Sequence, residues 1–370
     1  MNLPPFKLEQ YFNEYEFKAE YLLANSDCET VSIAELLLFE PDAKERFLAF
    51  RLGYTEVPGA ESLRREICRI YSTLEAGHVL VHAGAEEAIF LFMHSLLKAG
   101  DHVVVQRPCY QSLHEIPRGI GCDVSSWQAR EERGWSLNLS ELERLLRPET
   151  RAIVVSFPHN PTGYLMVKSD FLELNRLAQE RGIVLFSDEV YRECEYAAQD
   201  RLSAACDIND TAVSLGVLSK TYGLPGLRIG WAATRNSRLL ERMAELKAYT
   251  TICSSGPSEF LAEVALRHRE KLAQRNINFI RKNLTLLDDF FVRHSGRFSW
   301  IRPMAGPIAF PKLTGEAIGS FCRRLFEKSG VLLVPGTVFD DIDNHFRIGF
   351  GRKNLPAALV RLEEFLASNR

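Results

Sequence analysis

Three polar residues follow apolar segments that have the character of buried strands. Lys220, Asp188 and Asn160 each stand at or just after the end of such a segment. In an open α/β sheet, ligands bind at the carboxyl ends of the strands, because loops and helix N-termini converge there. We therefore expect the amine, the carboxylate and the amide to face one cavity and to serve nucleophilic or acid–base chemistry.

Lys220 is a candidate nucleophile. Gly223, Gly226 and Arg228 follow it, and two cations this close favour the binding of an anion such as phosphate. Arg228 would also lower the pKa of the amine, which favours the neutral form that attacks a carbonyl carbon and makes a Schiff base. The alternative is an ordinary surface lysine at the end of a strand.

Asp188 ends a very apolar segment and should be partly buried, so its carboxylate needs a cation or strong hydrogen-bond donors. A protonated pyridine nitrogen would supply that cation. Tyr191 could then donate from its phenol to an oxygen on the same ring, and Asn160, held between two prolines, presents an amide on a stiff loop. The alternatives are that Asp188 and Glu189 form a helix N-cap pair and that Asn160 is a simple turn residue.

Two further candidates lie where strands join helices. The small residues Gly84 and Ala85, before Glu86, leave the amides of a helix N-terminus open to an anion, although small residues here also permit close packing alone. Tyr110 offers a flat face for stacking on a heteroaromatic ring, although such an aromatic is more often part of a core.

Arg347 lies inside an apolar segment with the pattern of a strand. A buried guanidinium without a carboxylate partner is costly, and no acidic residue stands beside it in the sequence. The carboxylate of a substrate would be one partner. An ion pair with Asp340 or Asp341 is the alternative.

The segments that carry these residues alternate in character between residues 80 and 255. Short apolar segments predict buried parallel strands, and the amphipathic segments between them predict helices. This alternation predicts an α/β fold with a mostly parallel, doubly wound sheet. The predicted strands are 79–81, 102–106, 152–157, 183–187 and 212–218, and the predicted helices are 86–97, 139–146, begun by a capping box of Ser140 and Glu143, and 170–181, capped by Ser169.

After residue 256 the pattern predicts a second, smaller α+β domain. We expect helices at 258–271, 275–294 and 356–367 and short strands near 300, 308–310 and 346–349. The predicted division is an N-terminal segment, 1–40, that packs on the small domain and over the site, a large domain, 41–257, and a small C-terminal domain, 258–370.

The composition excludes several functions. The chain has 370 residues, 46% of them hydrophobic, and a formal charge of −3, which gives no electrostatic case for binding nucleic acid. The eight cysteines lie scattered without the close pairs of zinc or dithiol motifs, so we expect no metal site and a reducing, cytoplasmic location. The first 20 residues mix charges with aromatics, unlike a signal peptide or a membrane span.

Four stretches together resemble the fold-type I pyridoxal-phosphate enzymes, specifically the class I and II aminotransferases. They occur in the family's order, and the resemblance covers about residues 50 to 350: Asn160-Pro161-Thr162-Gly163, Asp188-Glu189-Val190-Tyr191, Ser219-Lys220 through Arg228, and Phe346-Arg347. The resemblance implies that the large domain binds pyridoxal 5'-phosphate. It also implies an exchange of amino groups between an L-amino acid and a 2-oxo acid, both small molecules.

The same resemblance implies a role for each residue near the coenzyme ring. Lys220 holds the coenzyme as a Schiff base and moves the proton of the substrate α-carbon. Asp188 pairs with the pyridinium nitrogen, and Asn160 and Tyr191 hold the ring oxygen. Tyr110 stacks on the ring.

Other residues are implied to bind the substrate and the phosphate. Arg347, beside Asn160, binds the substrate α-carboxylate. Tyr54 is similar to a tyrosine that reaches the phosphate of the neighbouring subunit, which implies a homodimer with shared active sites. The remaining residues implied to bind the phosphate are Gly84, Ala85, Glu86, Ser219 and Arg228.

Two departures from the family's pattern bear on the reaction. Val217 stands where the family commonly has a serine or threonine that donates to the phosphate, so Ser219 or a backbone amide would have to compensate. The stretch Leu23 to Thr30 lacks the usual glycine-proline entry and resembles the branch that contains capreomycidine synthase, a cyclising enzyme. A lyase or cyclase of the same fold, acting by elimination or replacement at the β-carbon, is therefore the alternative reaction.

Two other classes of protein fit less well. A coenzyme-binding regulator of transcription would carry a basic recognition helix, and the roughly 50 residues before the sheet are acidic and aromatic. A nicotinamide-dependent dehydrogenase would carry a Gly-x-Gly-x-x-Gly turn after an early strand, and the sequence has none there.

Overall fold

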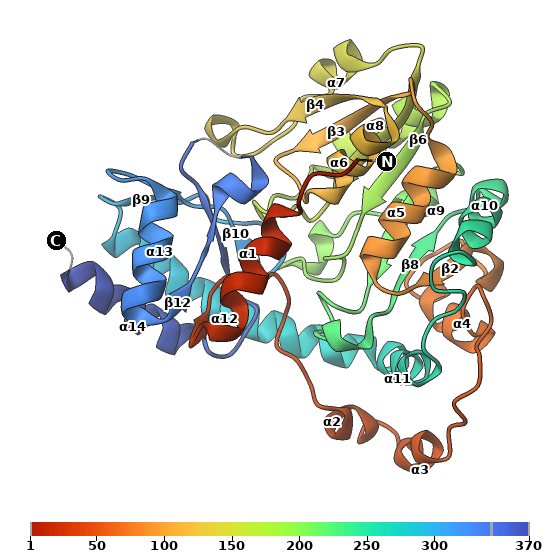
Figure 1. Cartoon of the computed structure of the whole chain (residues 1–370), viewed down its shortest axis with the longest axis horizontal. Coiled ribbons are helices and arrows are strands. Elements are labelled where there is room, and N and C mark those ends of the chain that lie inside the picture. Colours follow the sequence, from red (N-terminus) through yellow and green to blue (C-terminus); the bar gives the residue numbers. More distant parts are fainter. Residues whose placement is uncertain (1, 341–342, 369–370) are drawn as a thin grey trace.

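A seven-stranded sheet forms the centre of the larger part of the molecule (Figure 1). The computed structural model describes residues 2–340 and 343–368. Every neighbouring pair of strands is parallel except the two pairs that contain Gly230–Ala233, which confirms the predicted, mostly parallel sheet. The strand order is β2 (Val79–His82), β8 (Gly230–Ala233), β7 (Val213–Val217), β6 (Val184–Asp188), β5 (Thr150–Ser156), β3 (His102–Arg107) and β4 (Asp123–Gln128).

Helices cover both faces of this sheet, because alternate residues of a strand point to opposite sides. In β5, Ala152 and Val154 pack in the same cluster as Phe92, whereas Ile153 packs in the cluster of Phe171 on the other face. The fold is therefore doubly wound. The helices of this part are α4 (Glu61–Cys68), α5 (Ala85–Leu96), α6 (Ser112–Ile120), α7 (Leu139–Leu145), α8 (Lys168–Glu180), α9 (Ala205–Ile208), α10 (Ser237–Lys247) and α11 (Gly256–Arg267).

The C-terminal part combines helices with short strands, as expected for a smaller α+β unit. Its three-stranded sheet is antiparallel, in the order β10 (Ile308–Ala309), β14 (Phe346–Gly349) and β13 (Val334–Pro335). The other elements are α12 (Arg269–Arg293), β9 (Phe298–Ser299), β11 (Lys312–Leu313), α13 (Ile318–Ser329), β12 (Val331–Leu332) and α14 (Leu355–Ser368).

The predicted boundary between residues 257 and 258 lies inside α11. That helix packs on α4 of the larger part, and α12 then runs on toward the smaller part (Figure 1). We therefore propose that the small domain begins in α12. Among residues 2–340 and 343–368, no helix is long and apolar enough to cross a membrane.

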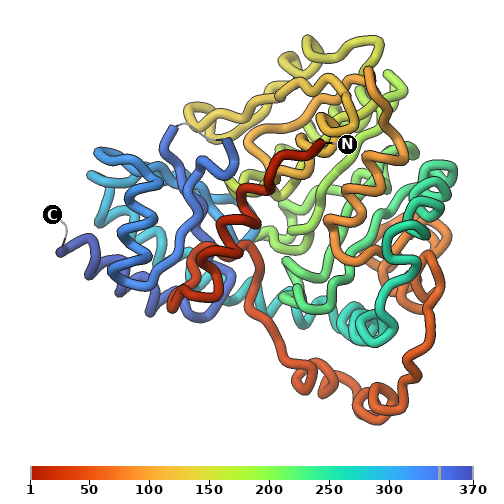
Figure 2. Tube along the Cα trace, viewed as in Figure 1, coloured from red at the N-terminus to blue at the C-terminus, as the bar shows by residue number. Residues whose placement is uncertain are grey.

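The N-terminal residues lie between the two parts of the molecule (Figure 2). After α1 (Lys7–Tyr15) and the short helix η1 (Glu16–Lys18), β1 (Tyr21–Leu22) pairs with β12. Residues 23–29, which we call the strap, run beside β14: the Gly349 amide donates to the Leu23 carbonyl at 2.7 Å, and the Glu29 amide to the Gly351 carbonyl at 2.9 Å. Two short helices, α2 (Ile33–Leu37) and α3 (Ala43–Leu48), then lead back to the larger part.

Both predicted helix caps are wrong by a small shift. The N-cap of α7 is Asn138, whose Oδ1 accepts from the Ser140 amide at 2.8 Å, because asparagine two residues earlier offers an equally good acceptor. Helix α8 begins at Lys168, so Ser169 lies within its first turn and donates to Asp170 instead.

The close passage of the strap over β14 requires glycine at position 349. A Cβ there would overlap the Asn25 carbonyl oxygen, which is backbone and can move only with the whole strap. We expect Gly349→Ala to lower the free energy of unfolding by about 1–3 kcal/mol, as overpacking of a filled interior does. Urea denaturation followed by circular dichroism measures this change.

Gly319→Ala is the matched control. Gly319 lies in the first turn of α13 with no atom near its would-be Cβ, so alanine there should leave the stability unchanged or raise it by up to about 0.5 kcal/mol. Equal stability of Gly349→Ala and the wild type would show that the strap does not pack on β14 in this way.

Candidate active site

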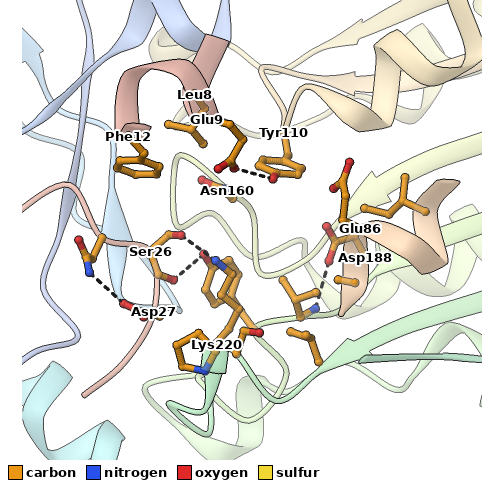
Figure 3. Close-up of a pocket in the computed structure, with 18 of the residues that line it drawn as sticks. Leu8, Glu9, Phe12, Ser26, Asp27, Glu86, Tyr110, Asn160, Asp188 and Lys220 are labelled. Carbon is orange, nitrogen blue, oxygen red and sulfur yellow. Dashed lines mark hydrogen bonds between the residues drawn. The ribbon is translucent and has the colours of Figure 1, made fainter. Parts of the chain in front are cut away.

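Most of the predicted residues meet at a cavity of about 610 Å³ on the carboxyl edge of the large sheet. Lys220, Asp188, Asn160 and Tyr191 line it from the ends of β5, β6 and β7 and the loops after them. The opposite wall comes from α1 and the strap, and Figure 3 shows Phe12 directed from α1 toward this space. The remaining lining residues are Leu8, Glu9, Glu16, Phe17, Asn25, Ser26, Asp27, Ala85, Glu86, Ile89, Tyr110, Val190, Val217, Ser219, Pro225 and Arg228.

Lys220 presents its amine to the strap. The Nζ atom donates to Ser26 Oγ at 2.8 Å (Figure 3). Burial lowers the pKa of the Lys220 amine, the Asp27 carboxylate opposes this shift, and the Arg347 guanidinium adds to it. The sequence predicts this effect for Arg228. In the structure, Arg347 is the guanidinium whose charge adds to this lowering of the Lys220 pKa.

Asp188 ends β6 and is almost completely buried. Its Oδ1 accepts from the Val190 amide at 3.1 Å within a turn, and no helix of the described chain begins there, so the alternative of a helix N-cap pair is wrong. This single donor does not offset the loss of water, so burial raises the pKa of Asp188 to about 6, although Val190 and the Lys220 amine oppose the shift. The ionised carboxylate of Asp188 therefore needs a cationic partner, which a ligand bound in the cavity could provide.

Tyr191 and Asn160 both point to the strap side of the cavity. The Tyr191 hydroxyl donates to the Ser26 carbonyl at 2.8 Å, and burial raises the pKa of this phenol. Asn160 Oδ1 accepts from Nη1 of Arg347 at 3.3 Å. Asn160 thus connects the cavity to the arginine behind it.

Arg347 is fully buried in β14 and does not itself line the cavity. Its Nη2 donates to the Ala24 carbonyl at 2.8 Å, and its Nε has no partner among the described residues. The alternative of an ion pair with Asp340 is wrong, because Asp340 pairs with Lys7 and Arg107. Asp341, the other alternative, lies outside the described residues.

The N-terminus of α5 forms an anion cradle against Arg228. Gly84 precedes the helix with a φ of 87°, and a Cβ there would lie 2.5 Å from Nη2 of Arg228. Gly230 fits as closely: a Cβ on it would lie 2.8 Å from the Ala85 amide nitrogen. The first amides of a helix have no partner within it, so the cradle joins free donors to a guanidinium, which suits a phosphate.

Two side chains lie beside the cradle. The sequence predicts that Glu86, near the helix N-terminus, helps to bind the phosphate. In the structure its side chain also reaches the cavity, where Ser112 Oγ donates to it at 3.1 Å. Burial raises the pKa of Glu86 to about 7. Ser219 lines the cavity beside Val217, as the proposed replacement for the missing hydroxyl requires.

Tyr110 and Tyr54 have different surroundings. Tyr110 lines the cavity, and its hydroxyl donates to Glu9 of α1 at 3.1 Å, while Phe6 packs against its ring. Tyr54 is 91% exposed and does not line this cavity, so within one chain it stays apart from the other predicted residues.

The N-terminal segment contributes residues that the sequence does not identify as part of the site. Ser26 holds both Lys220 and Tyr191, and Glu9, Phe12 and Glu16 form the far wall. The available signal is the departure of residues 23–30 from the family's pattern, together with the expectation that residues 1–40 pack over the site. Neither identifies which side chains enter the cavity.

Together these groups fit pyridoxal phosphate. The cradle at α5 suits its phosphate, the buried Asp188 suits a protonated ring nitrogen, and the amine of Lys220 suits an aldehyde.

Comparison with known proteins agrees with this fit. The profile of the family "Aminotransferase class I and II" matches residues 44–362, so the chain belongs to that family, and it is a pyridoxal-phosphate-dependent member with the type I fold. Capreomycidine synthase of Streptomyces vinaceus is 30% identical over 99% of this chain and 95% of its own length.

Two solved structures are similar over the whole chain. A pyridoxal-phosphate-dependent aminotransferase from Streptococcus suis has a TM-score of 0.94 and 32% identity, covering 100% of this chain and 99% of its own. The pyridoxal-phosphate-dependent cyclase OrfR has a TM-score of 0.92 and 32% identity with the same coverage. The neighbours thus include both an aminotransferase and a cyclase.

The raised pKa of Asp188 predicts a pH effect on stability. Its folded-state pKa of about 6 exceeds the ordinary 3.8, so the folded protein binds the proton more tightly, and ionisation costs stability as the pH rises from 4 through 6. In coenzyme-free protein we expect Asp188→Asn to be more stable than the wild type at pH 7.5 by roughly 1–3 kcal/mol. Urea denaturation at several pH values measures the difference, which should vanish near pH 4.

Asp289→Asn serves as the control, since Asp289 lies on α12 away from the cavity and should give no such pH-dependent gain. A wild type as stable as Asp188→Asn across the whole range would contradict the burial of an ionised carboxylate at β6.

Proposed function

We propose that the protein is an aminotransferase that exchanges the amino group of an L-amino acid with a 2-oxo acid. The observation that carries this proposal is the pairing, in one cavity, of a partly buried lysine amine and an almost completely buried aspartate carboxylate. Bound pyridoxal phosphate supplies an aldehyde that takes up amino groups and a ring that accepts electrons when the α-carbon loses its proton.

Lys220 moves the proton in this proposal. Its amine would hold the coenzyme and, when released by the substrate, would accept the proton of the α-carbon and return it to the coenzyme. Only a neutral amine can accept that proton, and burial favours the neutral form. Ser26 Oγ, 2.8 Å from Nζ, orients the amine for this transfer.

Asp188 and its neighbours hold the ring. The buried carboxylate of Asp188 keeps a proton on the ring nitrogen, and Tyr191 and Asn160 hold the ring oxygen. Tyr110 stacks on the ring. The phosphate is bound by Gly84, Ala85, Glu86, Ser219 and Arg228. The substrate α-carboxylate is bound by Arg347, which lies behind Asn160 and donates to its amide oxygen.

A lyase or cyclase is the second candidate, and the similarity to capreomycidine synthase and to the cyclase OrfR favours it. Both comparisons extend over the N-terminal segment that walls the cavity. Such an enzyme would use the same Lys220 and Asp188 to remove the α-proton. It would differ in the next step, in which a group leaves the β-carbon.

The N-terminal wall favours a substrate with a cationic side chain. Glu9, Glu16 and Asp27 line the cavity there, and Asp27 already pairs with Arg352 at 2.8 Å. Burial raises the pKa of the Glu16 carboxyl, Arg352 lowers it, and the carboxylates of Asp27 and Glu9 raise it further. A ligand cation would relieve this repulsion by pairing with Glu16.

We further propose a homodimer with shared active sites. Exposed apolar side chains gather around the expected contact, with Leu48 at 75%, Leu52 at 85% and Tyr54 at 91% exposure. A second copy would cover them and receive Tyr54 near its phosphate site. All eight cysteines are free, and we place the activity in the cytoplasm, where thiols stay reduced.

A panel of amino acids with pyruvate tests the reaction. We expect at least one amino acid to be converted to its oxo acid, with the coenzyme left in its amine form and restored by pyruvate, as followed by absorbance. Lys220→Ala should slow the conversion by at least about 100-fold, because it removes the base. Lys168→Ala, an exposed lysine outside the cavity, should keep wild-type rates. An enzyme that releases no oxo acid and always returns the coenzyme to its aldehyde form would refute transamination and support the second candidate.

Glu16→Gln tests the class of substrate. Removing the charge should lower kcat/KM for arginine and lysine by about 10- to 100-fold, as the loss of a hydrogen bond to a charged group does, and leave neutral amino acids unaffected. Glu14→Gln, on α1 but outside the cavity lining, is the control. Equal losses for cationic and neutral substrates would rule out charge recognition by Glu16.

A further inference from the structure

Two phenyl rings flank the buried guanidinium of Arg347. Its Cζ lies 5.9 Å from the ring centre of Phe12 on α1 and 5.4 Å from that of Phe339, in the short helix η6 (Gly336–Phe339). Within residues 2–340 and 343–368, no carboxylate lies at ion-pair distance from this arginine. Its hydrogen bonds go to neutral acceptors, the Ala24 carbonyl and the Asn160 amide oxygen.

This environment stabilises the guanidinium without neutralising it. A buried guanidinium has lost its water, and a carboxylate is the usual compensation. Aromatic faces attract the cation through their quadrupole, more strongly when the pair is desolvated, yet they carry no net charge. No contacting group of the described residues neutralises this charge, so it remains available to an anionic ligand, and the Nε atom, which has no partner among those residues, leaves a donor unused.

Phe12 is the one of the two rings that belongs to the N-terminal wall. It lines the cavity that contains Lys220, whereas Phe339 packs from the small domain. Because the guanidinium is fully buried with Phe12 in place, this ring helps to exclude water from the arginine on the cavity side.

We propose that Phe12 is a positioning residue for the substrate carboxylate. Its ring shields the Arg347 guanidinium from water and leaves it without a contacting carboxylate, so that it can bind that anion. The inference rests on the proposed function, in which Arg347 binds the α-carboxylate. Phe12 acts through the arginine and takes no part in the proton transfer.

The docking of α1 then becomes coupled to carboxylate binding. The Lys7 amide donates to Gln111 Oε1 at 2.9 Å, and the Tyr11 hydroxyl donates to the Leu333 carbonyl at 2.7 Å, so α1 is fastened to both parts of the molecule. The Lys7 ammonium also pairs with Asp340. Since coupling between two equilibria is reciprocal, a bound carboxylate should hold α1 more firmly, and loss of the Phe12 ring should weaken binding of the carboxylate.

The test measures binding to the holoenzyme, which does not depend on the later reaction steps. The amino acid of the panel that changes the coenzyme absorbance most is titrated, and the amine left by its decarboxylation is titrated beside it. We expect Phe12→Ala to raise Kd for the amino acid by about 3- to 30-fold, the range of a cation–π contact, and to leave Kd for the amine within about twofold. Phe12→Leu keeps the apolar bulk but lacks the aromatic face, so it should still show most of the rise in Kd for the amino acid. Phe12→Tyr keeps that face and should bind the amino acid as the wild type does.

Tyr15→Ala is the matched control, because it removes a ring of the same helix that packs on Phe326 and not on Arg347. Similar losses in Tyr15→Ala and Phe12→Ala, equal losses for amino acid and amine, or wild-type binding by Phe12→Leu would each overturn the inference. If Phe12→Ala does not fold, as judged by circular dichroism, Phe12→Leu and Phe12→Tyr decide the question alone.

Arg347→Ala separates this inference from the proposed function. If Arg347→Ala binds the amino acid as the wild type does, the assignment of the carboxylate to Arg347 is wrong, and the inference falls with it. If Arg347→Ala weakens the amino acid selectively and the Phe12 variants do not, the proposed function stands and the inference alone is refuted.

Discussion

The partial burial of the Lys220 amine is the constraint on which the rest of the site depends. An amine in water is protonated and cannot accept the proton of an α-carbon, and burial shifts the pKa of Lys220 toward the neutral form. The same burial acts on Asp188 in the opposite sense, because it raises the pKa of that carboxyl to about 6 and leaves the ionised form in need of a cation. Burial at one cavity therefore shifts the pKa values of both groups in the directions that suit a coenzyme with an aldehyde and a basic ring nitrogen.

The burial of Lys220 and Asp188 depends on contacts between segments far apart in the sequence. The strap passes so close to β14 that Gly349 and Gly351 have no room for a side chain. Ser26 of the strap then receives hydrogen bonds from both Lys220 and Tyr191, and Asp27 pairs with Arg352. A segment near the N-terminus thus closes a cavity whose lysine and aspartate both belong to the large sheet.

The range of the interactions involved decides how much of this arrangement the sequence predicts. Polar residues at the ends of apolar strands, such as Lys220 and Asp188, are predictable because a parallel sheet brings strand ends to one edge. Strand β4 is not predicted because it is an edge strand with a single buried residue, and β8 is not predicted because it runs antiparallel within a parallel alternation. Ser26, Phe12 and Glu16 are not predictable, since their place depends on the docking of α1 and the strap, which no local periodicity encodes.

This separation of roles also bears on the reaction. In the proposed function, Lys220 acts as the base and Asp188 acts through the ring nitrogen; Asp188 ends β6 and Lys220 follows β7, and both would serve transamination and elimination equally well. The fate of the substrate after proton removal depends on how its side chain is held, and here that wall is built by α1 and η1, which carry Glu9 and Glu16. Because α1 is attached through side-chain contacts to both parts of the molecule, substitutions on it can change the substrate or the outcome without disturbing the sheet. The similarity of one chain to both an aminotransferase and a cyclase is therefore physically consistent.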